Sequence, residues 1–200
     1  MRTGLVAIML LTFLSACGPD IAPSAASSPS SGTGVSLASA PRISQPPVTP
    51  PTPPGTNLPD FVCADASGGK TGVSNVTTAR VGENPGYDRF VLQFDPIVPT
   101  YTVKRQAKPV FTQGASGQSV TLSGTSGVLV TVHSAQAATT FSGSTDLVHS
   151  DFQVIKEARQ VQDFEGYVSW GIGLGTPACM RVFVIDDPAR LVVDFQVASS

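Results

Sequence analysis

Short runs of alternating apolar and polar side chains dominate the last roughly 140 residues of the chain, about one ordinary domain. Phe90, Leu92 and Phe94 fall on one face of such a run, because the side chains of a strand point alternately to its two sides. The runs 181–185 and 190–195 are rich in β-branched and aromatic residues. Many short strands with turn signals between them predict an all-β domain, and we expect a β-sandwich of short antiparallel strands.

Turn signals mark several connections between these runs. The segment 186–189, Asp-Asp-Pro-Ala, separates the last two runs and suits a tight turn. The glycine-containing segments 114–117 and 123–127 are two further hairpin candidates. Two segments leave alternatives open: 154–164 has the pattern of a strand or of an amphipathic helix, and 134–140 that of a short helix or a loop.

Three glycines alternate in the segment Gly171-Ile172-Gly173-Leu174-Gly175. The spacing resembles a phosphate-binding loop only superficially, because no helical pattern follows it. We interpret these glycines as positions where a strand bends or bulges.

Composition excludes two classes of protein. Charged residues make up only 13% of the 200 residues, and the formal net charge is −2. We therefore expect neither a broad basic surface for nucleic acid nor a highly charged disordered chain. The apolar run from Gly4 to Leu14 is too short for a mature transmembrane helix, which needs about 20 residues.

The N-terminus has the pattern of a bacterial lipoprotein signal peptide. Arg2 precedes a short apolar stretch that ends at Leu14-Ser15-Ala16-Cys17. An aliphatic residue, two small residues and a cysteine, in that order, match a lipobox. We expect residues 1–16 to be a signal peptide and Cys17 to carry the lipid. The protein is therefore expected to be exported and held by lipid at the outer face of the bacterial cytoplasmic membrane.

A proline- and serine-rich segment follows. Between Gly18 and Pro59, 11 of the 42 residues are proline and eight are serine. Such a segment has too few large apolar residues to form a core, and its second half favours polyproline II. We expect residues 17–60 to be a lipid-anchored disordered linker and residues 61–200 to be the folded domain.

The chain contains three cysteines. If Cys17 is lipidated, Cys63 and Cys179 remain. In an exported protein we expect these two to form one disulfide, with two free thiols as the alternative.

No catalytic or metal-binding motif stands out. The sequence contains neither HExxH, nor GxSxG, nor a Walker loop, and its carboxylates are too scattered to nominate a glycosidase pair. The two histidines are His133 and His149, the second within the polar segment 146–151. We expect no catalytic residue, metal or cofactor. The alternative is a cell-wall or metal-dependent hydrolase that uses both histidines.

Four segments resemble the AMIN-like domains of actinobacterial exported lipoproteins: 86–94, 163–166, 170–174 and 181–195. The last also resembles the end of AMIN domains proper, and the resemblance covers about residues 61–197. AMIN domains are β-sandwiches that recruit cell-wall amidases to the division site by binding peptidoglycan. The resemblance implies a non-catalytic cell-envelope binding module that contacts peptidoglycan or a cell-wall protein, so that any enzyme would be a separate partner.

A ligand from the cell wall would contact exposed aromatic rings and cations. The candidates are the aromatic residues with a polar edge and two arginines from the matching segments: Tyr87, Tyr101, Tyr167, Trp170, Arg89 and Arg190. The alternative for each aromatic residue is a packing role in or beside the core. The alternative for each arginine is an ion pair with Asp88, Asp186 or Asp194.

Overall fold

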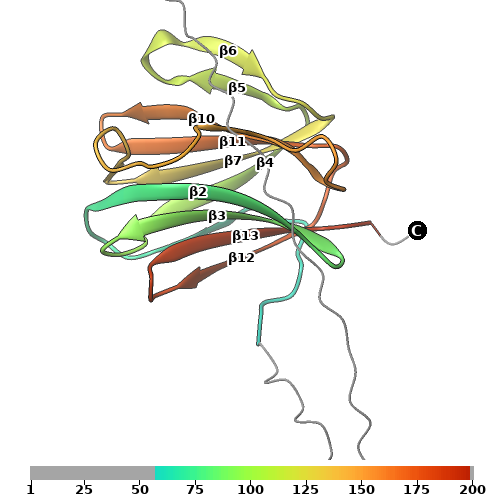
Figure 1. Cartoon of the computed structure of the whole chain (residues 1–200), viewed down its shortest axis with the longest axis horizontal. Coiled ribbons are helices and arrows are strands. Elements are labelled where there is room, and N and C mark those ends of the chain that lie inside the picture. Colours follow the sequence, from blue (N-terminus) through green and yellow to red (C-terminus); the bar gives the residue numbers. More distant parts are fainter. Residues whose placement is uncertain (1–56, 199–200) are drawn as a thin grey trace, which may run out of the picture. The chain divides into compact units, whose positions relative to one another are not determined.

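The computed structural model describes residues 57–198, which fold into two stacked β-sheets with a β-hairpin outside them (Figure 1). The predicted all-β fold class is confirmed. The first sheet has six strands in the spatial order β1-β4-β7-β11-β10-β9. Their bounds in that order are Ala66–Gly68, Tyr101–Gln106, Ser126–His133, Tyr167–Leu174, Ile155–Phe164 and Asp146–Val148.

The second sheet has five strands in the order β12-β13-β3-β2-β8. Their bounds are Met180–Ile185, Arg190–Gln196, Tyr87–Asp95, Ser74–Asn84 and Ala135–Gln136. All neighbouring strands in both sheets are antiparallel except β2 and β8, which pair in parallel. The turn predicted at 186–189 joins β12 to β13.

The core lies between the two sheets, where period-two alternation places apolar side chains. Phe90, Leu92 and Phe94 point into it from β3, as predicted. Trp170 of β11 packs against Phe90 across the sandwich, with ring centroids 5.6 Å apart. The two sheets therefore share one main hydrophobic cluster.

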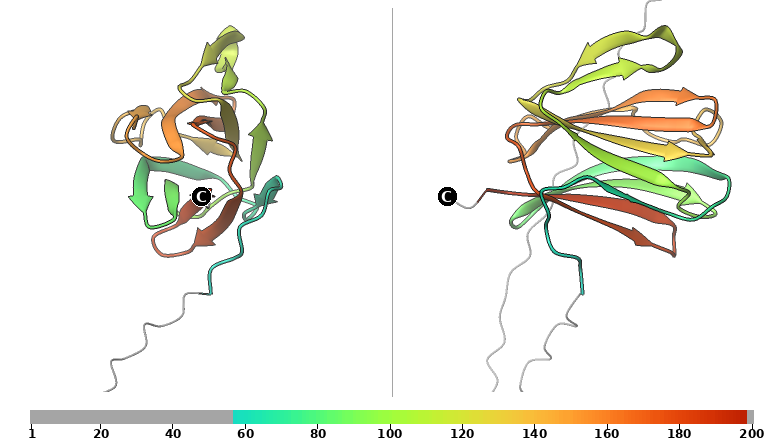
Figure 2. Two further views of the ribbon diagram at one scale, coloured as in Figure 1. Left: turned by 90° about the vertical axis from the view of Figure 1, so that its right-hand side faces the viewer. Right: turned by 180° about the vertical axis from the view of Figure 1, so that it is seen from behind.

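The hairpin is formed by β5 (Val110–Gln113) and β6 (Gln118–Thr121), joined by a 3₁₀ turn at Gly114–Ser116. It confirms the hairpin predicted at 114–117 and lies on the outer side of the six-stranded sheet, away from the other sheet (Figures 1 and 2). Phe111 and Leu122 form a second, small cluster there with Val161 of β10.

Glycines in the six-stranded sheet make room for this hairpin. A β-carbon on Gly171 or on Gly127 would lie 2.8 Å from the ring of Phe111. Gly173 meets Leu122 and Ser123 in the same way. Our interpretation of these glycines as bends or bulges is wrong for Gly171 and Gly173, because the register shifts lie in β10, whereas β11 pairs evenly with β7. Gly175 does lie at a bend, directly after β11. Gly171 and Gly173 are instead sites of close approach between two layers.

The ambiguous segments resolve as follows. Residues 154–164 contain strand β10, not a helix. Residues 134–140 contain the two-residue strand β8 and then turns. The segment 123–127 is not a hairpin turn, because β6 pairs with β5 whereas β7 pairs with β4 and β11.

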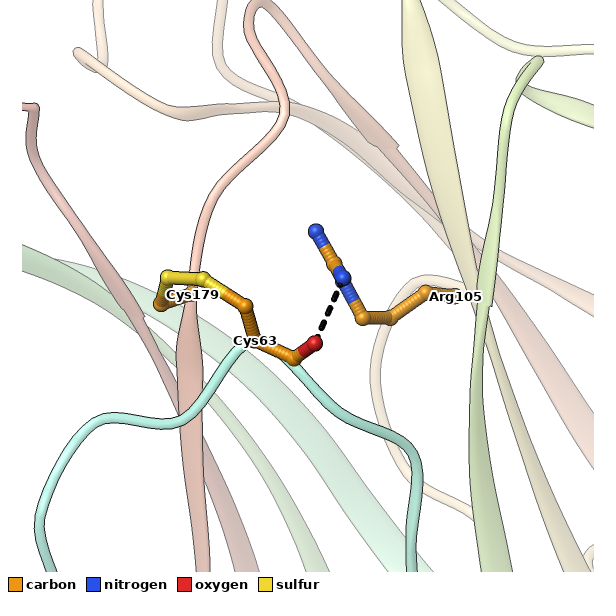
Figure 3. The surroundings of a disulfide bond; sticks show 3 residues. All are labelled: Cys63, Arg105 and Cys179. Atoms are coloured by element: carbon orange, nitrogen blue, oxygen red, sulfur yellow. Dashed lines mark hydrogen bonds between the residues drawn. A yellow bond between two sulfur atoms is a disulfide. The ribbon is translucent and has the colours of Figure 1, made fainter.

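The predicted disulfide between Cys63 and Cys179 is confirmed, with 4.2 Å between the two Cα atoms (Figure 3). Next to it, Val62 and Met180 exchange two backbone hydrogen bonds of 2.8 and 2.9 Å. The bridge therefore ties the start of the folded region to Cys179, the residue directly before β12.

The predicted signal peptide, the lipidation site Cys17 and nearly all of the linker 17–60 lie outside the described residues. Within 57–198, the structure contains no helix of the length and apolar character needed to cross a membrane.

Candidate functional site

Two of the six predicted ligand residues belong to the core. Trp170 is 0% exposed and Tyr101 is 7% exposed. Their positions follow from alternation, since Trp170 lies between Val168 and Ile172 on the inward face of β11. Burial also raises the pKa of the Tyr101 hydroxyl. The prediction that these two rings form ligand platforms is wrong, and their packing alternative holds.

Tyr87 and Arg89 lie on the outer face of the five-stranded sheet. The Arg89 guanidinium binds the carboxylate of Asp194 through two hydrogen bonds, Nε to Oδ1 at 2.6 Å and Nη2 to Oδ2 at 2.9 Å. Arg181, which the sequence did not nominate, donates from Nε to the same Oδ2 at 2.6 Å. The hydrogen bonds from Arg89 to Asp194 raise the pKa of Arg89 above its ordinary value.

Three aromatic rings surround these arginines. The Arg89 guanidinium lies 5.3 Å from the Tyr87 ring centroid and 5.5 Å from that of Phe183. Arg181 lies 4.5 Å from Phe61 and 4.7 Å from Tyr87. The packed cations cover Asp194, which is completely buried although it belongs to the outer face. The ion-pair alternative is therefore confirmed for Arg89, and this cluster fastens β3, β12 and β13 together.

Arg190 donates from Nε to the carbonyl oxygen of Pro188 at 3.2 Å. Among residues 57–198 it forms no ion pair, so the acidic partner proposed as its alternative role is not observed. It is the first residue of β13, in the five-stranded sheet, whereas Tyr167 belongs to the six-stranded sheet.

Tyr167 belongs to a row of three rings on the outer face of the six-stranded sheet. It lies directly opposite His133 of β7 on one side and Phe164 of β10 on the other. The His133 and Tyr167 rings meet edge to face with centroids 5.0 Å apart. Tyr167 is 43% exposed and Phe164 is 48% exposed. We call these three residues the aromatic row.

The turn between β10 and β11 creates part of this row. Glu165 and Gly166 both have positive φ, at 50° and 77°, the conformation of a two-residue hairpin turn. Such a turn places the residues on either side of it opposite each other, which here are Phe164 and Tyr167. Phe164 was not among the candidates predicted from the sequence. The Glu-Gly pair between two alternating runs was a turn signal that could have placed it opposite Tyr167.

Hydroxyl and amide groups lie beside the aromatic row. Ser169, two residues after Tyr167, shares a 3.1 Å hydrogen bond with Thr131 and pairs with Gln162 across the sheet. A hollow of about 450 Å³ adjoins them between β10 and the β5–β6 hairpin. Its lining is mainly polar and uncharged, and includes Gln113, Ser116, Thr145, Gln160, Gln162, Asp163 and Phe164. We call this hollow the glutamine groove.

The aromatic row and the glutamine groove together form a surface suited to an uncharged, hydroxyl-rich ligand. Aromatic faces can pack against the C–H groups of a sugar ring, while amides and hydroxyls both donate and accept hydrogen bonds. Asp163 is the one charged residue in the lining, and its carboxylate accepts from the backbone N–H of Ala137 at 3.3 Å. The groove therefore offers little electrostatic attraction to an ion.

The two histidines lie at opposite ends of β10. His133 is next to Tyr167, which pairs with Phe164 at the last residue of β10. His149 instead donates its backbone N–H to the carbonyl oxygen of Lys156, near the first residue of the strand. Eight residues of strand separate these ends, roughly 25 Å at 3.3 Å per residue. The two histidines therefore cannot share one metal ion, and the metal-dependent form of the hydrolase alternative is wrong.

Among residues 57–198, no group of three or more His, Cys, Asp or Glu side chains is placed to hold a metal ion. His149 stacks on the ring of Phe152 with centroids 4.3 Å apart. Asp146 accepts a 2.6 Å hydrogen bond from Arg159. His149 and Asp146 of the polar segment 146–151 therefore both contact other side chains of the domain.

One comparison with known proteins matches the folded region of the chain. No curated protein and no solved structure matches the chain. The sequence model of the AMIN-like domain matches residues 74–197, which are 124 of the 200 residues and nearly all the strands of both sheets. Because this match covers more than half of the chain, the protein belongs to the AMIN-like domain family.

Proposed function

We propose that this protein is a non-catalytic module that binds peptidoglycan at the bacterial cell envelope through the aromatic row and the glutamine groove. The observation that carries the proposal is the row itself, with the exposed rings of Phe164 and Tyr167 and the partly buried ring of His133 on three adjacent strands beside a mainly uncharged polar hollow. The AMIN-like domain is typically a binding module of the cell envelope, which supports the class of ligand.

The disulfide and the AMIN-like domain indicate an extracytoplasmic location. We further propose that Cys17 carries a lipid, that residues 1–16 are removed, and that residues 17–60 act as a linker. This arrangement would place the domain within reach of the wall while the lipid stays in the outer face of the cytoplasmic membrane.

Binding of this kind can be weak at each site. A flat row of rings offers stacking and a few hydrogen bonds, and it excludes little water. Many copies anchored in one membrane face a polymer with repeated sites, so their effective concentration compensates for modest single-site affinity. We expect a Kd in the high micromolar range for one domain, roughly −4 to −5.5 kcal/mol.

Co-sedimentation of the purified full-length protein with isolated sacculi tests the proposal. We expect the wild type to sediment with sacculi and the Phe164→Ala/Tyr167→Ala variant to lose about tenfold in affinity, because two stacking surfaces are removed. Phe152→Ala is the matched control, since Phe152 also stacks on a histidine but at the other end of β10.

Wild-type protein that sediments no better than an unrelated protein would contradict wall binding and favour a protein partner. Equal losses for the row variant and for Phe152→Ala would contradict the assignment of the site. Release of soluble muropeptides during incubation, measured in the same samples, would contradict the non-catalytic role.

A further inference from the structure

A cavity lies at the end of the sheet opposite to the aromatic row. The inward-facing positions of three neighbouring strands end there: Arg105 follows Val103 in phase on β4, Ser126 precedes Val128 on β7, and Leu174 ends β11. At this open end of the sandwich, two inward-facing positions are therefore polar: the cation of Arg105 and the hydroxyl of Ser126. The cavity has a volume of about 370 Å³.

The disulfide region holds the arginine in place. The Nη1 atom of Arg105 donates to the carbonyl oxygen of Cys63 at 2.8 Å (Figure 3). The backbone N–H of Arg105 donates to Oδ1 of Asp65 at 2.9 Å. Pro177 and Ala178, just before Cys179, form another wall of the cavity. Within the described part of the chain the Arg105 guanidinium forms no ion pair. Its remaining donors are therefore free to bind an anion.

Ser126 gives an independent indication of a ligand. It is 5% exposed and lines the cavity, and its hydroxyl has no hydrogen-bond partner among residues 57–198. A buried hydroxyl without a partner is unfavourable, so such groups usually meet a ligand or an ordered water. The next residue, Gly127, also lines the cavity.

We propose that this cavity binds the free carboxylate end of a short peptide with small apolar side chains. The planar guanidinium of Arg105 matches a carboxylate, and the Ser126 hydroxyl can donate to one of its oxygens. The buried side chains of Val128 and Leu174, with Ala178, offer an apolar wall for methyl groups. No acidic residue lines the cavity to oppose the carboxylate.

This inference deepens the proposed function without depending on the same residues. Peptidoglycan carries short peptides as well as sugars, so one wall polymer could contact both ends of the six-stranded sheet. The chemistry of the cavity itself does not require the aromatic row, because His133 and Ser126 are at opposite ends of β7. The two sites can therefore be tested separately.

Titration of the purified full-length protein with N-acetyl-alanyl-alanine, followed by NMR or calorimetry, tests the cavity. We expect saturable binding with a Kd on the order of 1 mM, and binding at least about tenfold weaker for the same dipeptide with a C-terminal amide. Arg105→Gln should lose about tenfold, whereas Arg105→Lys should lose less because it keeps the charge. Ser126→Ala should lose about threefold.

Arg80→Gln is the matched control, because Arg80 is an arginine of β2 in the other sheet and does not line the cavity. Equal affinity for the acid and the amide, an unchanged Kd for Arg105→Gln, or no binding at 20-fold the expected Kd would each overturn the proposal. Intact disulfide and an unchanged unfolding midpoint confirm that a variant is folded.

The dipeptides of D- and L-alanine distinguish the source of the carboxylate. Preference for the D form assigns the cavity to wall peptides, and preference for the L form assigns it to the C-terminus of a protein. Failure of every peptide titration, with sacculus binding that still depends on Phe164 and Tyr167, would remove the cavity and leave the proposed function intact.

Discussion

Among residues 57–198, two carboxylates are completely buried, and each joins parts of the chain that are far apart in sequence. Asp194 binds two arginines, as described above. Asp88 points into the core from β3, and its Oδ2 accepts hydrogen bonds from the backbone N–H groups of Val154 and Ile155 at 2.7 and 2.8 Å. Asp88 therefore fixes the start of β10 in one sheet to β3 in the other.

Replacement of Asp88 should destabilise the fold, because its carboxylate accepts two buried backbone hydrogen bonds. Asp88→Ala leaves two buried N–H groups without an acceptor, so we expect a loss of about 2–4 kcal/mol in the free energy of unfolding. Urea unfolding measures it, with Asp186→Ala as the control because Asp186 forms an exposed pair with Lys70. A loss within about 0.5 kcal/mol of the control would contradict this role.

At the scale of elements, the sequence predicted strands best where alternation was unbroken and partners were close. The runs that became β3, β12 and β13 are of this kind. β10 was ambiguous because a register shift between Gln160 and Gln162 interrupts its period of two. The aromatic row could not be predicted in full, because His133 joins it only through strand pairing.

The docking of the β5–β6 hairpin also depends on pairing that the local sequence does not encode. Gly171→Ala should disturb it, because the new β-carbon would lie 2.8 Å from the Phe111 ring. We expect a loss of about 1–3 kcal/mol in unfolding free energy. Gly82→Ala is the control, since a β-carbon there has no atom within 4 Å.

A double-mutant cycle identifies the cause. If the Phe111 ring opposes the new methyl group, Gly171→Ala should cost less in a Phe111→Ala background than in the wild type. Additive losses would contradict direct contact between the two positions.

At the scale of the whole molecule, the proposed anchor makes a separate prediction. Cys17→Ala should abolish lipid attachment and leave a larger, unprocessed precursor, because the cysteine thiol is the acceptor of the lipid. Labelling of cells with a fatty-acid probe, followed by purification of the protein, measures this. Equal labelling of the variant and the wild type would contradict it.

The disulfide acts on the whole domain, because Cys63 precedes the first strand and Cys179 precedes β12, 116 residues later. Eleven of the 13 strands in the described part of the chain lie inside the loop that it closes. In the chain-entropy description, a cross-link restricts the unfolded chain more as the loop becomes longer.

We therefore expect the Cys63→Ser/Cys179→Ser variant to lose about 4 kcal/mol in the free energy of unfolding, since the cross-link no longer limits the unfolded state. Urea unfolding of the wild type with and without reductant, beside the variant, tests this. Reduction should bring the wild type to the stability of the variant, whereas reductant should leave the variant unchanged. A variant as stable as the oxidised wild type would show that β-sheet pairing at Val62 and Met180 holds the N-terminal segment without the bridge.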